Sequence, residues 1–132
     1  VKHNENAGTY TCVSKNYMND SFGVEKYGEK KAEIELNVRF KPQMNVSHKK
    51  IAVLNEEAQS QNISCITIAN PEPVFNWYKN GVKINSSKFQ IGRVIKKSKN
   101  LYENILIIND LNENDWNEKY VCETINLLGS SQ

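Results

Sequence analysis

The chain has 132 residues and a mass of 15.1 kDa, which is enough for one ordinary domain, or for one domain and part of another. Apolar residues make up 39% and charged residues 24%, a balance that suits a globular protein and excludes a mainly disordered one. The formal net charge of +2 is too small to indicate nucleic acid as a partner, and the longest apolar runs are too short to insert into a membrane.

Short stretches in which apolar and polar residues alternate follow one another along the chain and predict β-strands. Asn80-Gly81 directly follows one of these stretches and is a hairpin signal. No stretch sustains a helical period. Several short strands separated by turn signals are typical of an antiparallel sandwich, so we expect an all-β fold. The expected strands cover residues 32–38, 62–68, 74–79, 103–108 and 119–123.

The spacing of cysteine, tryptophan and tyrosine is the most informative pattern. Cys65 and Cys122 lie 57 residues apart, Trp77 follows the first by twelve positions, and Tyr120 precedes the second by two. Two facing sheets would explain all four residues. The cysteines would bridge the layers, Trp77 would pack against the bridge, and the Tyr120 hydroxyl would bond to the backbone at a corner. The alternative is a pair of unrelated buried thiols.

Here the sequence resembles the immunoglobulin superfamily, in its intermediate or I-set type, over residues 42–132. Residues 77–81 resemble strand C of that family, and residues 120–129 resemble strand F and the turn after it. The resemblance implies an immunoglobulin-like antiparallel β-sandwich that lacks most of its last strand. Strand E and the corner after it are matched by Leu106, Ile108, Leu111 and Asp115, the first three of which the resemblance places in the core beside Trp77 and Tyr120.

One departure from the family pattern lies at this corner. Between Asp115 and Cys122 the chain has one more residue than the family usually has, and the usual glycine is missing. We therefore expect a locally remodelled corner with Trp116 packed beneath it.

Residues 1–41 repeat the end of the same pattern. Residues 6–12, which end in Tyr10-Thr11-Cys12, resemble a second corner and strand F, and residues 31–39 would form strand G. We therefore predict that residues 1–41 are the C-terminal part of an upstream immunoglobulin-like domain, joined stiffly to the next one, and that Cys12 pairs with a missing upstream cysteine. The connection from about residue 17 to 30 is long. It is either a lineage insertion or a contact loop that exposes Tyr17, Met18, Phe22 and Tyr27.

The residue types that carry catalysis do not converge. The histidines, His3 and His48, lie in different modules without metal-ligand spacing, and the sequence contains no phosphate-binding loop or nucleophile elbow. We therefore expect no enzyme activity and no cofactor. Arg93, Lys96, Lys97 and Lys99, with Lys49-Lys50, form basic clusters that suit either a heparan-type glycan or a plain solvated edge. Four Asn-x-Ser sites for N-glycosylation occur, at Asn19, Asn45, Asn62 and Asn85.

The resemblance implies an extracellular cell-adhesion or recognition receptor, similar to the nephrin, neural cell adhesion molecule and contactin groups. Such a module would lie at the cell surface as part of a single-pass membrane protein, and would bind proteins homophilically or heterophilically. Two alternatives stay open: the ligand-binding ectodomain of a receptor tyrosine kinase or phosphatase, and a structural repeat of a matrix or muscle protein. The candidate contact residues on strands C and F are Asn76, Tyr78, Val121 and Glu123, which could also be ordinary sheet surface.

Overall fold

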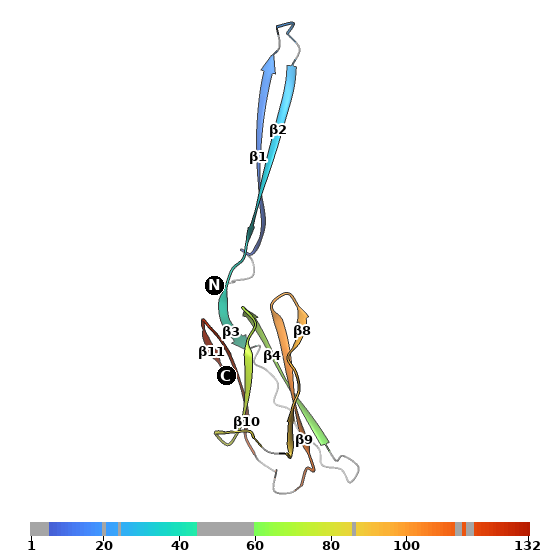
Figure 1. Cartoon of the computed structure of the whole chain (residues 1–132), viewed down its shortest axis with the longest axis vertical. Coiled ribbons are helices and arrows are strands. Elements are labelled where there is room, and N and C mark those ends of the chain that lie inside the picture. Colours follow the sequence, from blue (N-terminus) through green and yellow to red (C-terminus); the bar gives the residue numbers. More distant parts are fainter. Residues whose placement is uncertain are drawn as a thin grey trace. The chain divides into compact units, whose positions relative to one another are not determined.

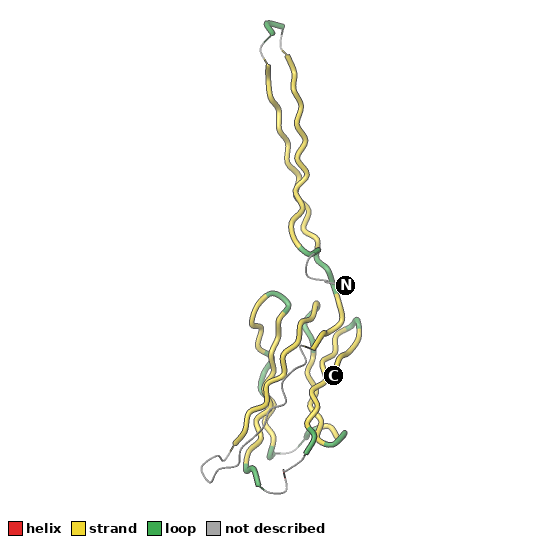
Figure 2. Tube along the Cα trace, turned by 180° about the vertical axis from the view of Figure 1, so that it is seen from behind, coloured by secondary structure: helices red, strands yellow, loops and turns green. Residues whose placement is uncertain are grey.

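The computed structural model describes residues 6–19, 21–23, 25–44, 60–85, 87–112, 115 and 118–132. The chain divides into two units, Val1–Val38 and Arg39–Gln132, each of which is described here by itself. Most of the described chain is β-strand, as the yellow segments of Figure 2 show. The all-β prediction is therefore confirmed. No described segment is a helix long and apolar enough to cross a membrane.

The first unit is an antiparallel hairpin of β1 (Gly8–Asn19) and β2 (Glu25–Leu36) (Figure 1). The expected loop from residue 17 to 30 is wrong in extent, because both strands continue into it and only the turn after β1 separates them. The reason is cross-strand pairing: Tyr17 lies opposite Tyr27, and the two ring centroids are 5.5 Å apart. Met18 also lies on a strand, and of the four predicted contact residues Phe22 alone lies in the turn.

The second unit consists of two antiparallel sheets. Among the described residues, one sheet has the order β11-β10-β5-β6 and the other the order β3-β4-β9-β7, with β8 also paired to β9. This is the expected immunoglobulin-like sandwich. The strands of this unit are β3 (Phe40–Met44), β4 (Ser60–Asn70), β5 (Val74–Lys79), β6 (Val82–Lys83), β7 (Phe89–Ile91), β8 (Ile95–Ser98), β9 (Leu101–Asn109), β10 (Tyr120–Asn126) and β11 (Gly129–Ser131).

The core lies between these sheets. Successive side chains on a strand point to opposite faces, so every second residue of each strand faces this core. Cys65 on β4 and Cys122 on β10 form a disulfide whose Cα atoms are 6.4 Å apart. Trp77 is buried, and it lies directly opposite Cys122 in the β5–β10 register. Leu106 and Ile108 on β9 are also buried, and Leu111 and Tyr120 pack against the core while partly exposed.

A buried asparagine completes the core and was not predicted. Asn104 faces inward on β9, between the core residues Tyr102 and Leu106, and is 1% exposed. Its Oδ1 accepts a hydrogen bond from Trp77 Nε1 at 2.8 Å, and its Nδ2 donates to the Gly92 carbonyl at 2.6 Å. Both polar ends of the amide are therefore satisfied, as burial requires.

The expected hydrogen bond from the Tyr120 hydroxyl to the backbone is wrong. The buried hydroxyl of Tyr120 has no hydrogen-bond partner within the described part of the chain, and burial raises the pKa of this phenol. Tyr10 of the hairpin does form such a bond, because its hydroxyl donates to the Asn6 carbonyl at 3.0 Å. Trp116, which was expected beneath the remodelled corner, lies outside the described residues.

Candidate functional site

The outer face of the β5–β10 pair brings together the four candidate contact residues. Asn76 lies directly opposite Glu123, and Tyr78 lies opposite Val121. Because Phe75, Trp77 and Thr124 are buried, their neighbours in the alternation face outward. The same face continues to Val74, which is 63% exposed, and to Ile125 opposite it. The result is a surface that combines an aromatic ring, aliphatic side chains and one carboxylate.

Glu123 organises the polar part of this surface. Its Oε2 accepts hydrogen bonds from the Tyr78 hydroxyl at 2.8 Å and from Asn76 Nδ2 at 3.4 Å, and its Oε1 accepts one from Gln132 Nε2 at 3.2 Å. The hydrogen bond from Tyr78, followed by that from Gln132, lowers the pKa of Glu123. The same bond raises the pKa of Tyr78. At neutral pH the pair is therefore a carboxylate bound to a neutral phenol.

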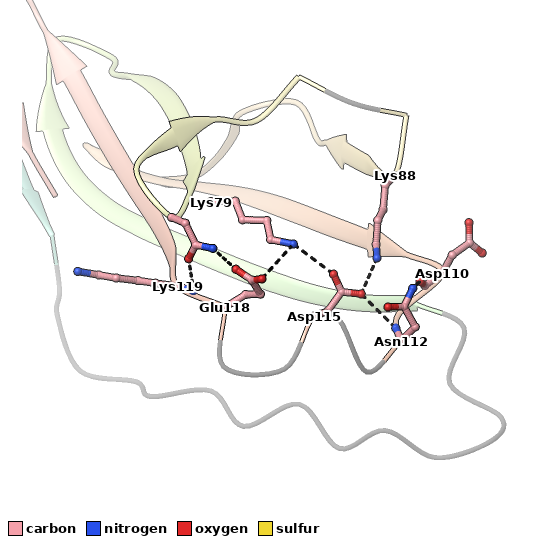
Figure 3. A network of polar contacts seen from close by, with 8 residues as sticks. Lys79, Lys88, Asp110, Asn112, Asp115, Glu118 and Lys119 are labelled. Carbon is pink, nitrogen blue, oxygen red and sulfur yellow. Dashed lines mark hydrogen bonds and ion pairs between the residues drawn. The ribbon is translucent and has the colours of Figure 1, made fainter.

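A second polar network stands at the end of this sheet (Figure 3). Asp115, whose side chain is 3% exposed, accepts from Lys79 Nζ at 3.3 Å and from Lys88 Nζ at 2.5 Å. The backbone N–H of Asn112 donates to the same carboxylate at 3.1 Å. Lys79 also lies 3.8 Å from Glu118, which contacts the Asn80 side chain. The network connects the end of β5 to the segment that follows β9.

The pKa of Asp115 reflects two opposed effects. Burial is the largest and alone would raise the pKa. The hydrogen bonds from Lys88, the Asn112 backbone and Lys79 together outweigh it, so the pKa of Asp115 lies below its ordinary value. Asp115 is therefore held as a carboxylate by two lysine ammonium groups and one backbone N–H.

The hairpin carries the other predicted contact residues. Tyr17 is 72% exposed and Phe22 is 90% exposed. Lys15 Nζ lies 5.5 Å from the centre of the Tyr27 ring and 3.5 Å from Glu29, whose other oxygen contacts Lys31 Nζ at 3.0 Å. The Tyr27 hydroxyl donates to Glu29 at 2.7 Å, and this bond is the main reason that the pKa of Glu29 is lowered.

The predicted glycosylation sites fall in different settings. Asn62 on β4 and Asn85 after β6 are both exposed. Asn19 ends β1, but its side chain lies outside the described part, as does the whole of Asn45. The histidines, His3 and His48, also lie outside the described residues. Within the part that is described, no group of three or more His, Cys, Asp or Glu residues could hold a metal ion.

The basic cluster is partly engaged by neighbouring groups. Lys97 Nζ lies 2.7 Å from Glu103, and Lys96 Nζ lies 6.0 Å from the centre of the Tyr102 ring. Arg93 and Lys99 are exposed, and Lys49-Lys50 lie outside the described residues. Two of the cationic groups are thus directed at side chains of this unit rather than at a ligand.

Sequence reasoning missed two residues that shape the unit. Asn104 could have been found from the sequence, because it lies two residues before Leu106 and four before Ile108 and so shares their inward face. A polar residue at such a position indicates a buried hydrogen bond. Lys88 had no such signal, because its contact with Asp115 joins residues 27 positions apart.

The two facing sheets, the disulfide between them and the tryptophan beside it define an immunoglobulin-type β-sandwich. A family model described as "Immunoglobulin domain" matches residues 41–126, and the chain belongs to this family. Among solved structures, the crystal structure of Dpr2 Ig1–Ig2 in complex with DIP-Theta Ig1–Ig3 matches with a TM-score of 0.66 and 24% identity, over 96% of this chain and 39% of that one. That likeness shows the fold.

Sequence relatives belong to the same superfamily. Protein amalgam of Drosophila melanogaster is 29% identical over 96% of this chain and 35% of its own length. Neural cell adhesion molecule 1 of Gallus gallus is 25% identical over 93% of this chain and 10% of its own length. Inactive tyrosine-protein kinase 7 of Gallus gallus is 36% identical over 64% of this chain and 7% of its own length. The chain thus spans about a third of the length of amalgam and a smaller share of the others. The predicted resemblance to the adhesion-type immunoglobulin superfamily is confirmed.

Proposed function

We propose that this chain is an extracellular, non-catalytic protein-binding segment of a cell-adhesion or recognition receptor that a single span anchors at the cell surface. Its partner is a protein, either a second copy of the same receptor or another immunoglobulin-domain protein. The likeness to neural cell adhesion molecule 1 over nearly the whole chain supports the adhesion role. No catalytic cluster enters the proposal, because Asp115 and Glu123 are occupied by structural hydrogen bonds.

The observation that carries the proposal is the outer face of β5 and β10. It is an outward-facing sheet surface on which the Tyr78 hydroxyl is bound to Glu123 and the Tyr78 side chain lies opposite Val121. Tyrosine is enriched at protein interfaces because it offers a large apolar ring together with a polar end. Lys83, opposite Tyr78 on β6, adds a cation at the edge of the face. Such a mixed surface suits a partner that has both apolar and charged groups.

A cell-binding experiment on the full-length protein tests this assignment. Suspension cells that display the protein are mixed with each other and with cells that display other immunoglobulin-domain receptors. We expect Y78A to weaken the adhesion of the wild type about tenfold or more, because a central interface tyrosine contributes well over 1 kcal/mol. Q90A, which changes an exposed residue on the opposite sheet, is the control and should bind like the wild type. Equal adhesion of Y78A and Q90A would remove this face from the proposal.

The domain organisation belongs to the same proposal. The hairpin unit, residues 1–38, corresponds to strands F and G of an upstream immunoglobulin-like domain, and residues 39–132 correspond to an I-set domain. Phe40 and Lys41, which were expected in the upstream part, belong to β3 of the second unit. One face of the hairpin supports the upstream domain, because Tyr10 pairs with Ile34 and Cys12 pairs with Ala32 along it. All four residues are exposed here, although they are types that normally enter a core. The remaining strands of an upstream domain would cover them.

A second candidate function is the ectodomain of a receptor tyrosine kinase or phosphatase, in which this segment binds ligand and chemistry lies elsewhere. The match to inactive tyrosine-protein kinase 7, at 36% identity over 86 residues, favours it. The sequence of the complete transcript separates the two candidates, since a kinase or phosphatase region downstream of the membrane span would select the second.

A further inference from the structure

The sheet that does not carry the proposed contact face has a cluster of aliphatic side chains on its outer surface, which we call the isoleucine face. Cys65 on β4 and Leu106 on β9 point into the core. Every second residue along these strands, such as Ile66 on β4 and Ile105 on β9, therefore faces outward. Ile66 is 41% exposed and Ile95 is 36% exposed, while the other aliphatic residues of this face are partly exposed. The isoleucine face consists of Ile66 and Ile68 on β4, Leu101, Ile105 and Ile107 on β9, and Ile95 on β8.

Polar residues share this face with the isoleucines: Gln43 of β3 lies opposite Ile68, and Asn62 and Gln90 both lie opposite Ile107. Glu103 lies opposite Ile66 and accepts a hydrogen bond from Ser64 Oγ at 2.5 Å. Its other oxygen contacts Lys97 Nζ at 2.7 Å. The carboxylate is therefore neutralised within the face, and the isoleucines around it remain in contact with water. Apolar side chains that gather on one outer face of a sheet mark a candidate surface for a covering group.

Asn62 lies on the same face and begins the sequence Asn62-Ile63-Ser64, an acceptor site for N-linked glycan. It is exposed, and no described residue forms a hydrogen bond with its side-chain amide. In register it lies directly opposite Ile107 and diagonally from Ile105. Side chains so placed are about 5 Å and about 7–8 Å apart. Ile66, four positions along the strand, is about 13 Å away.

We propose that Asn62 carries an N-linked glycan whose first sugar residues cover the isoleucine face. A sugar ring presents C–H groups on its faces and hydroxyl groups on its rim, so it can pack on Ile105 and Ile107 while it stays hydrated. A glycan of this bulk excludes protein from the surface beneath it. The sandwich then has one face that binds protein and one that is shielded. The inference rests on the proposed extracellular location but not on Tyr78 as the contact residue.

Occupancy is tested on the full-length protein secreted by eukaryotic cells. Peptide N-glycosidase converts each glycosylated asparagine to aspartate, and mass spectrometry of the digest locates the conversion. We expect conversion at Asn62. An unmodified Asn62 in the secreted protein would overturn the proposal.

Coverage is tested with a fluorescent dye that binds exposed apolar surface. N62Q should raise dye binding several-fold over the wild type, while N85Q, which removes the exposed site after β6, should leave it unchanged. The triple variant N62Q/I105T/I107T should return to the wild-type level, which identifies the isoleucine face as the source. Trimming the glycan of the folded wild type to its first sugar keeps the sequence intact and should preserve most of the cover.

Equal dye binding by N62Q and the wild type would overturn the proposal even if Asn62 is occupied. An unoccupied Asn62, together with cell adhesion that is lost in I105T/I107T, would overturn it and assign the face to a protein partner instead. The adhesion assay with Y78A reports separately on the proposed function, so failure of one leaves the other measurable.

Discussion

Asp115 shows how a single buried charge can connect several parts of the fold. Its carboxylate is almost fully enclosed, yet it stays ionised because two ammonium groups and one backbone N–H surround it. The sequence pattern identified Asp115 as a corner residue but gave no sign of Lys88 as its partner. Long-range ion pairs depend on which loops meet, and alternation along one strand carries no such information.

We expect D115N to destabilise the fold by about 2 kcal/mol, because hydrogen bonds to charged groups contribute about that much. Urea unfolding of the purified protein, followed by tryptophan fluorescence, measures the change. D110N is the matched control, since Asp110 is exposed and its positive φ suits asparagine equally well. A D115N variant as stable as D110N would show that the enclosed carboxylate contributes nothing.

The same comparison has a defined pH dependence. The pKa of Asp115 is depressed in the folded state, so the unfolded chain takes up this proton first as the pH falls. The stability difference between the wild type and D115N should therefore be complete above about pH 5. It should shrink below about pH 4, as Asp115 becomes protonated. A difference that stays constant down to pH 3 would contradict the assignment.

At the scale of elements, β9 and β1–β2 show where pattern reading works and where it fails. The apolar run from Ile105 to Ile108 predicted most of β9, although Asn104 also faces inward on this strand. The hairpin extension, residues 17–30, was predicted as a long connecting loop from the resemblance to the family; its residues 25–31 are mostly charged and show no apolar period that would indicate a strand. Its two strands are stabilised by side-chain pairs across the strands, such as Lys15 with Glu29. The sequence of one strand does not show which residues of the other strand will lie opposite it.

Asn104 connects β9 to two other segments of the sandwich, and its loss should be costly. N104A leaves the Trp77 indole N–H and the Gly92 carbonyl without their partner. We expect a loss of about 2–4 kcal/mol in the free energy of unfolding, because each buried unpaired group costs about 1–3 kcal/mol. N109A, at the end of the same strand, should cost far less. If both variants lose the same amount, the buried amide has no special role.

At the scale of the whole molecule, the sequence was sufficient for the fold class because the cysteine spacing, the tryptophan position and the strand alternation agree with one another.

The disulfide bonds of the full-length protein test the proposed domain organisation. Closing a 57-residue loop should stabilise the second unit by about 4 kcal/mol, so C65A/C122A should lose roughly that amount. In a non-reduced digest of the full-length protein, Cys65 should be linked to Cys122, and Cys12 to a cysteine outside residues 1–132.

Cys12 itself distinguishes the domain proposal from its alternative. It is exposed and has no disulfide within this chain. A free Cys12 thiol in the full-length protein would mean that the hairpin is not the end of a disulfide-bridged upstream domain. The outcome for Cys65 and Cys122 would be unaffected, because their bridge closes within one unit.

The hydrogen bond between Tyr78 and Glu123 has a further consequence, which concerns entropy. A tyrosine that moves freely between rotamers must lose that freedom when a partner immobilises it, and the loss opposes binding. Tyr78 has already given up much of this freedom, because its hydroxyl is bound to a carboxylate on the neighbouring strand. A partner that docks on its ring would therefore meet a smaller entropic penalty, and complexes formed by E123A should be weaker even if Glu123 never touches the partner.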